Sequence, residues 1–168
     1  MNYIWTPAVG YDVDPIVKLA QTHFENEIDM FFRPEPITYS RNITLAVVNQ
    51  FYIPASTLLT VAKSDNKLFA YTWANCNERN PWSDDPMVFI KMAHVDMTLP
   101  IRTRLKLIVD MFAIWENFAK LTNNKIICST TMRKDQDGFL RLHQNHGYEV
   151  RGSYAYKKVD TTQATPAN

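Results

Sequence analysis

Residues 138–148 read Gly138-Phe-Leu-Arg-Leu-His-Gln-Asn-His-Gly-Tyr148. We predict a short helix here, from near Gln136 to Asn145. Gly147 follows it, and glycine commonly ends a helix because it adopts the left-handed conformation without strain. Beyond the helix, residues 148–152 and the tyrosine-rich residues 153–159 are predicted to pair as two strands. The stretch therefore indicates a helix that leads directly into a β pair.

The segments before this stretch predict a strand, a long helix and another strand. Residues 125–131 are rich in β-branched side chains, which is typical of a short strand. The helix from about Pro100 or Thr103 to Leu121 is apolar on most of its surface and should pack on most sides. Residues 87–97 form a long predicted strand. Because side chains alternate along a strand, one face should carry four of its residues: Ile90, Met92, His94 and Asp96.

The N-terminal half predicts two helices followed by a hairpin. The first helix should end before Pro34 and Pro36, because proline lacks an amide donor and restricts the residue before it. Two β-rich runs then flank a short Asp/Asn turn, which is typical of an antiparallel hairpin. The predicted elements are helices over residues 14–31 and about 40–52, and strands over 57–63 and 68–74.

The complete predicted order is β-α-α-β-β-β-α-β-α-β, an α/β (α+β) fold with a mixed sheet and helices on its faces. The chain has 168 residues, which corresponds to about one domain. We assign residues 1–159 to this domain. Residues 160–168 are small, polar and unpatterned, as is usual for a chain terminus.

Charge and cysteine content exclude several classes of protein. Lys and Arg number 18 against 17 Asp and Glu, for a formal net charge of +1. This balance gives no field for binding nucleic acid or anionic lipid. No apolar run is long enough for a membrane span, and Cys76 and Cys128 are too scattered for a zinc site, so no metal is expected. We expect free thiols and a cytoplasmic protein.

This element order and the ending Leu142-His143-Gln-Asn-His-Gly147-Tyr148 resemble the GNAT superfamily of N-acetyltransferases. The resemblance covers roughly residues 3–159 by element order and is strongest over residues 89–158. It implies a mostly antiparallel sheet with helices on both faces, and transfer of an acyl group from acetyl-CoA to an amine. The acceptor would be a small amine or an amine of a protein.

The resemblance also implies where the cofactor would lie. In members of the superfamily, a pair of central strands diverges to admit the pantetheine arm, and we expect this divergence around Val95 and Ile127. The backbones of Val95 and Met97 should line the notch, and Cys128 should begin the departing strand.

The pyrophosphate would then lie at the start of the following helix, whose dipole favours an anion. The matching residues are Arg102-Thr-Arg-Leu105-Lys-Leu107. Leucines stand at two positions where the superfamily has small residues, and we expect both side chains to enter the core. We therefore expect weak binding of acetyl-CoA. In the alternative, the side chains of three cations bind the phosphates, with Thr103 between them: Arg102, Arg104 and Lys106.

Amine acylation needs a base for the attacking amine and an acid for the leaving thiolate. His143 occupies the position where the superfamily often has a tyrosine acid, and it could instead pack as a helix histidine. His94 and Asp96 are candidates for the base, or else the polar end of a core strand. Residues 31–36 resemble the variable segment that walls the acceptor site.

A second interpretation remains open at this level. The chain resembles small, degenerate GNAT-like proteins of bacteriophages, some of them virion components. It would then work without catalysis, as an interaction or structural protein bound to a protein partner or assembly and carried in a virion.

Overall fold

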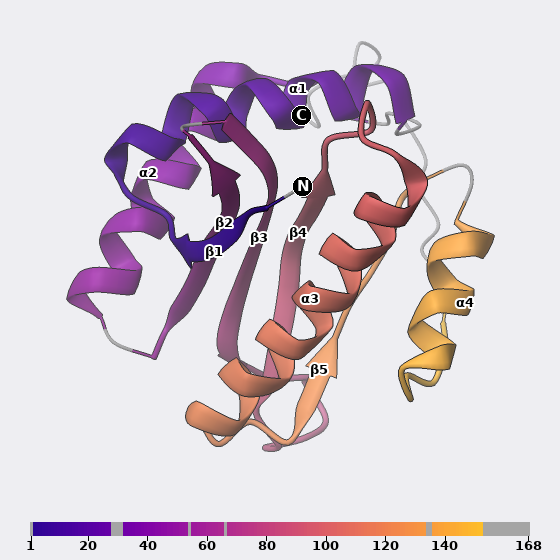
Figure 1. Cartoon of the computed structure of the whole chain (residues 1–168). Coiled ribbons are helices and arrows are strands. Elements are labelled where there is room, and N and C mark those ends of the chain that lie inside the picture. Colours follow the sequence, from indigo (N-terminus) through magenta and orange to yellow (C-terminus); the bar gives the residue numbers. More distant parts are fainter. Residues whose placement is uncertain (1, 28–31, 54, 66, 134–135, 153–168) are drawn as a thin grey trace, which may run out of the picture.

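The computed structural model describes residues 2–27, 32–53, 55–65, 67–133 and 136–152. Five strands form one sheet in the order in which they follow along the chain (Figure 1). The first four pair antiparallel, and the fifth runs parallel to the fourth. This sheet confirms the predicted fold class and the hairpin. The strands are β1 (Ile4–Pro7), β2 (Thr57–Ser64), β3 (Lys67–Glu78), β4 (Met87–Val95) and β5 (Ile126–Cys128).

Helices cover both faces of the sheet. A 3-10 turn, Gly10–Asp12, leads into α1 (Val13–Glu27), which packs with α2 (Pro36–Tyr52) on one face around Leu59, Val61 and Tyr71. The other face carries α3 (Ile101–Leu121), which lies in front of the sheet in Figure 1, and α4 (Asp137–Asn145). Trp115 and Phe112 of α3 are the largest side chains buried there. The sheet therefore separates two apolar cores.

The first correction concerns Pro36, which begins α2 and does not end the helix before it. Glu35 caps this helix by accepting a hydrogen bond from the amide of Ile37 at 3.4 Å. Proline suits the first helical position because its missing N–H would have no intrahelical partner there. The second helix is consequently longer than predicted. Residues 28–31, the predicted end of the first helix, lie outside the described residues of the chain.

The second correction concerns β4, whose side chains do not alternate regularly. Ala74 of β3 pairs with Ile90, but its neighbour Trp73 pairs with Met92, so Lys91 is an extra residue in β4. Such a β-bulge exchanges the two faces of the strand beyond it. Ile90 accordingly packs in the core under α3, whereas Met92 packs in the core under α1 and α2. The prediction that Ile90 and Met92 share a face was therefore wrong.

The C-terminal prediction is confirmed only for its helix. Gly147 follows α4 with a φ of 83°, which is the left-handed conformation expected there. Residues 148–152 contain no strand, and residues 153–159, the other half of the predicted β pair, lie outside the described residues, as does the tail 160–168. Within the described residues, we find no helix with the length and apolar character needed to cross a membrane.

Candidate active site

The strands β4 and β5 pair over only three positions and then diverge. The paired residues are Met87 with Ile126, Val88 with Ile127 and Phe89 with Cys128. Beyond Phe89, β4 continues to Val95 beside β3, whereas β5 ends at Cys128. The predicted divergence is present and Cys128 lies at it, but the gap opens earlier along β4 than we expected, from Ile90 onward.

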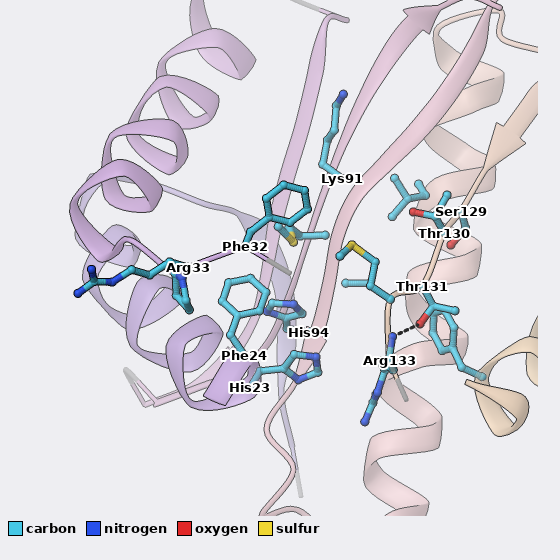
Figure 2. A pocket seen from close by; sticks show the side chains of 16 residues that line it. His23, Phe24, Phe32, Arg33, Lys91, His94, Ser129, Thr130, Thr131 and Arg133 are labelled. Atoms are coloured by element: carbon cyan, nitrogen blue, oxygen red, sulfur yellow. Dashed lines mark hydrogen bonds between the residues drawn. The ribbon is translucent and has the colours of Figure 1, made fainter. Parts of the chain in front are cut away.

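A pocket of about 290 Å³ occupies this gap. Residues 90–94 of β4 form one wall, and residues 129–133, which follow β5, form the other. His23 and Phe24 of α1 and residues 32–34 complete the lining on the face that α1 and α2 cover (Figure 2). Residues 32–34 belong to the segment predicted to wall the acceptor site. Val95 and Met97 are not among the lining residues.

His143 reaches the pocket through Ser129. His143 is buried, with Nε2 3.0 Å from Oγ of Ser129 and Nδ1 2.9 Å from the carbonyl oxygen of Phe139. Because a carbonyl only accepts, Nδ1 carries a proton, and in the neutral ring Nε2 accepts from the serine hydroxyl. Burial is the main cause that lowers the pKa of His143. Ser129 and Phe139 line the pocket and His143 stands behind them.

His94 lines the pocket directly and belongs to a buried aromatic cluster. Its Nδ1 lies 2.5 Å from the hydroxyl of Tyr71, and its ring stacks on His23 with the centroids 4.1 Å apart. Burial, followed by the charges of His23 and Arg133, holds the pKa of His94 well below its usual value. Burial and Arg133 lower the pKa of His23 to about 4. Both imidazoles are therefore neutral at pH 7.

Asp96, the other candidate base, lies beyond the end of β4 and outside the pocket lining. Its Oδ1 accepts from the amide of Thr98 at 2.9 Å and from the Thr98 hydroxyl at 2.6 Å. This arrangement is an Asx turn, which shapes the loop before α3. The structure thus brings His94 to the pocket and gives Asp96 a partner in the loop.

The start of α3 differs from an open phosphate-binding loop. The amides of Thr103 and Arg104 both donate to the carbonyl of Pro100, at 2.9 and 3.1 Å. The prediction that Leu107 enters the core is confirmed, since its exposed fraction is 0%. The same prediction for Leu105 was wrong, since 45% of it is exposed. Residues two apart on a helix point to different sides, so both leucines could not face the sheet.

The three cations of this region have different surroundings. Arg104 extends over the loop and donates to the sulfur of Met97 at 3.4 Å, and its Nε is buried with no hydrogen-bond partner among the described residues. Arg102 is exposed. Lys106 donates to the hydroxyl of Tyr3 at 2.9 Å and lies 3.8 Å from Asp110. Arg104 therefore has a buried donor without a partner among the described residues, whereas Lys106 is engaged by Tyr3 and Asp110.

The described residues contain no group of His, Cys, Asp and Glu that would hold a metal ion. Sequence reasoning missed His23 and Tyr71 as members of the site. Tyr71 joins it because β3 pairs Tyr71 with His94, a register that one sequence does not determine. Ser129 and His94 present polar atoms to the gap and could hold a thioester, and Arg102 and Arg104 are the cations at the start of α3 that could meet its phosphates.

No protein-family model and no curated protein matches the sequence. A predicted acetyltransferase from Clostridium acetobutylicum, solved with acetyl-CoA, matches with a TM-score of 0.70 and 13% identity, over 94% of this chain and 96% of that chain. The aminoglycoside 6'-N-acetyltransferase AAC(6')-IG from Acinetobacter haemolyticus matches with a TM-score of 0.66 and 18% identity, over 95% and 100% of the two chains. AAC(6')-Iy, solved with a bisubstrate analogue of CoA, matches with a TM-score of 0.67 and 12% identity, over 95% and 99%. The fold of this chain is the GNAT acetyltransferase fold.

Proposed function

We propose that this protein, which has the GNAT fold, is an acyl-CoA-dependent N-acyltransferase acting on a small amine. The observation that carries the proposal is the pocket in the gap between β4 and β5, which has His94 on one wall and Ser129, backed by His143, on the other. A gap in a sheet leaves backbone groups free to bond a ligand. The matched acetyltransferases include proteins solved with acetyl-CoA and with a CoA bisubstrate analogue.

We assign Ser129 and His143 to the leaving-group side of the reaction. Acetyl-CoA supplies the acyl group when bound. In its protonated form, His143 passes the Nε2 proton through the Ser129 hydroxyl toward the departing sulfur. The lowered pKa of His143 makes its imidazolium a stronger acid and also leaves the neutral ring as the main form at pH 7.

We assign the other wall of the pocket to the acceptor amine. His94 is the base, and residues 32–34 together with Phe24 and Met92 form the apolar surface against which the acceptor packs. The pocket volume of about 290 Å³ suits a small molecule.

A thermal melt with acetyl-CoA tests the proposal. A ligand at about 100 times its Kd adds about 2.7 kcal/mol to stability, which raises the midpoint of a domain this size by roughly 5–11 °C. We expect such a rise in the wild-type protein and a smaller one in Arg104→Ala at the same acetyl-CoA concentration. Lys120→Ala, at the far end of α3, is the matched control and should keep the full rise.

One observation favours a second candidate, a GNAT-fold protein without catalysis. The helical hydrogen bonds of Thr103 and Arg104 leave few amides for a pyrophosphate at the start of α3. No midpoint rise at any acetyl-CoA concentration would favour this candidate, with a protein partner as its ligand. The bacteriophage origin stays a prediction.

A further inference from the structure

A continuous row of polar atoms leads from the pocket into the core between the sheet and the helices α1 and α2. His94 lines the pocket, and its Nδ1 lies 2.5 Å from the hydroxyl of Tyr71 on β3. That hydroxyl lies 2.7 Å from the hydroxyl of Tyr39 on α2. Tyr71 is completely buried, whereas Tyr39 is half-buried and so retains exposed surface. The row therefore leads from the pocket to Tyr39 near the start of α2, a residue that keeps part of its surface exposed.

The row has two alternative directions of hydrogen bonding. In the first, Nδ1–H of His94 donates to Tyr71, and Tyr71 donates to Tyr39, which leaves the lone pair of Nε2 for the pocket. In the second, Tyr39 donates to Tyr71 and Tyr71 donates to Nδ1, so Nε2 carries the proton. Nε2 makes no hydrogen bond within the described residues. All three residues are neutral in both directions.

An imidazolium at His94 would be costly. The ring is buried, and the groups that face it are His23 from α1, Tyr39 from α2 by way of Tyr71 of β3, and the cation Arg133 from the segment after β5. Removing a charge from water without an opposite charge nearby is unfavourable. Within the described residues, none of the groups that face the ring is a carboxylate. A base at this position must therefore pass its proton on.

We propose that His94, Tyr71 and Tyr39 form a proton relay that deprotonates the acceptor amine while His94 stays neutral. This inference rests on the proposed function and extends it. The ammonium N–H bond breaks as Nε2–H forms, and Nδ1 gives its proton to Tyr71. Tyr71 gives its hydroxyl proton to Tyr39, which releases its own proton to surface water. After the product leaves, Tyr39 takes up a proton from surface water, Tyr39 and Tyr71 each pass a hydroxyl proton back toward Nδ1, and Nε2 releases its proton to water in the pocket, so the row regains its first direction.

His94 is the catalytic residue in this relay, and Tyr71 and Tyr39 are positioning residues that act through it. His23 stacks on the imidazole and Phe24 meets it edge-on, with the centroids 5.3 Å apart. These contacts restrict the ring, so the tautomer of His94 and the direction of the hydrogen bonds through Tyr71 and Tyr39 change together. In water the Nε2–H tautomer of a neutral imidazole is preferred. The relay requires the Nδ1–H tautomer of His94 in the resting protein.

The first test uses 15N NMR of the protein labelled at histidine, which contains only four histidines. We expect wild-type His94 at pH 7 to be neutral with the proton on Nδ1. Tyr71→Phe should move the proton to Nε2. Tyr52→Phe, on the same helix as Tyr39 but 82% exposed, should leave the tautomer unchanged. A proton on Nε2 in the resting protein, a charged ring, or no change in Tyr71→Phe would overturn the proposal.

The second test measures thiol release from acetyl-CoA with benzylamine as the probe amine. Without the relay His94 must hold the charge itself, so we expect kcat of Tyr71→Phe to fall by about 10²-fold at pH 7 and to rise steeply with pH. The KM for acetyl-CoA should not change. Tyr39→Phe should show the same pH dependence of kcat with a smaller loss of kcat. This variant also tests the relay if Tyr71→Phe fails to fold. Equal pH profiles in wild type and both variants would contradict the relay. Failure of wild type to acetylate any amine would count against the proposed function, whereas the NMR result would still decide the relay's geometry.

Discussion

The hydroxyl of Ser129 lies 3.0 Å from Nε2 of His143, and the opposite ring nitrogen is held 2.9 Å from the backbone carbonyl of Phe139. The carbonyl fixes the tautomer, so the serine and the imidazole are oriented before any ligand enters. Ser129 directly follows β5, and His143 comes from α4. The geometry of the Ser129–His143 pair therefore depends on how α4 packs against the segment after β5.

Replacing this pair should lower turnover with little loss of fold. We expect His143→Phe to reduce kcat by about 10²–10⁴-fold, the usual share of a general acid. Ser129→Ala should cost a similar factor, and the double variant should cost hardly more, because the two residues act as one unit. Thiol release from acetyl-CoA measures the effect, with His146→Gln as the control. Full turnover in both single variants would assign the pair to packing alone.

The indole of Trp115 donates to the hydroxyl of Thr72 at 2.8 Å in the core under α3. Thr72→Val would leave this buried N–H unpaired, which costs about 1–3 kcal/mol. For a domain of this size the midpoint of unfolding should fall by roughly 2–12 °C. Thr60→Val is the matched control, because the buried hydroxyl of Thr60 has no hydrogen-bond partner among the described residues. An equal loss in the two variants would contradict this account.

The buried histidines predict an acid-sensitive fold. The pKa of His23 is lowered to about 4 and that of His94 lies well below its usual range, whereas in the unfolded chain both take up protons near pH 6.5. Below pH 6.5 the unfolded state therefore binds more protons, and the free energy of unfolding falls as the pH falls. Between its pKa in the folded protein and its pKa in the unfolded chain, each histidine contributes about 1.4 kcal/mol per pH unit to the fall in the free energy of unfolding. His23→Gln should flatten this slope between pH 6 and 4 in urea titrations, and an unchanged slope would contradict the prediction.

The two glycines of the α4 region should respond oppositely to alanine. Gly147 has a φ of 83°, so Gly147→Ala should cost about 1–2 kcal/mol although the added Cβ meets no atom within 4 Å. Gly138 lies within the helix and also has free space around it. Gly138→Ala should raise stability by about 0.4–1 kcal/mol, because it restricts the unfolded chain. Thermal melts of the two variants check the signs.

Local patterns were sufficient to predict most of the elements. Gly147 ends α4 as its conformational freedom suggests, and the hairpin of β2 and β3 follows from two β-rich runs around a short turn. Pro36 was misjudged because proline suits both the end of one helix and the first turn of the next. A choice between them depends on the cap that Glu35 provides.

The site was less predictable because its members meet through tertiary pairing. His143 and His94 were predicted as candidates because each lies on an element that the family resemblance identifies. Tyr71 and Ser129 carry no local signal, since a tyrosine in a strand and a serine after one are ordinary. The roles proposed for them depend on the register of β3 with β4 and on the packing of α4.

The extra residue Lys91 makes the orientation of the second half of β4 depend on the bulge. Pairing Lys91 regularly opposite Trp73 would exchange the two faces of the strand from Met92 onward. His94 would then turn from Tyr71 toward the core under α3. Deleting Lys91 would instead keep Ile90 opposite Ala74 and Met92 opposite Trp73, so His94 would stay beside Tyr71. The bulge, and not the length of the strand alone, therefore directs His94 toward the pocket.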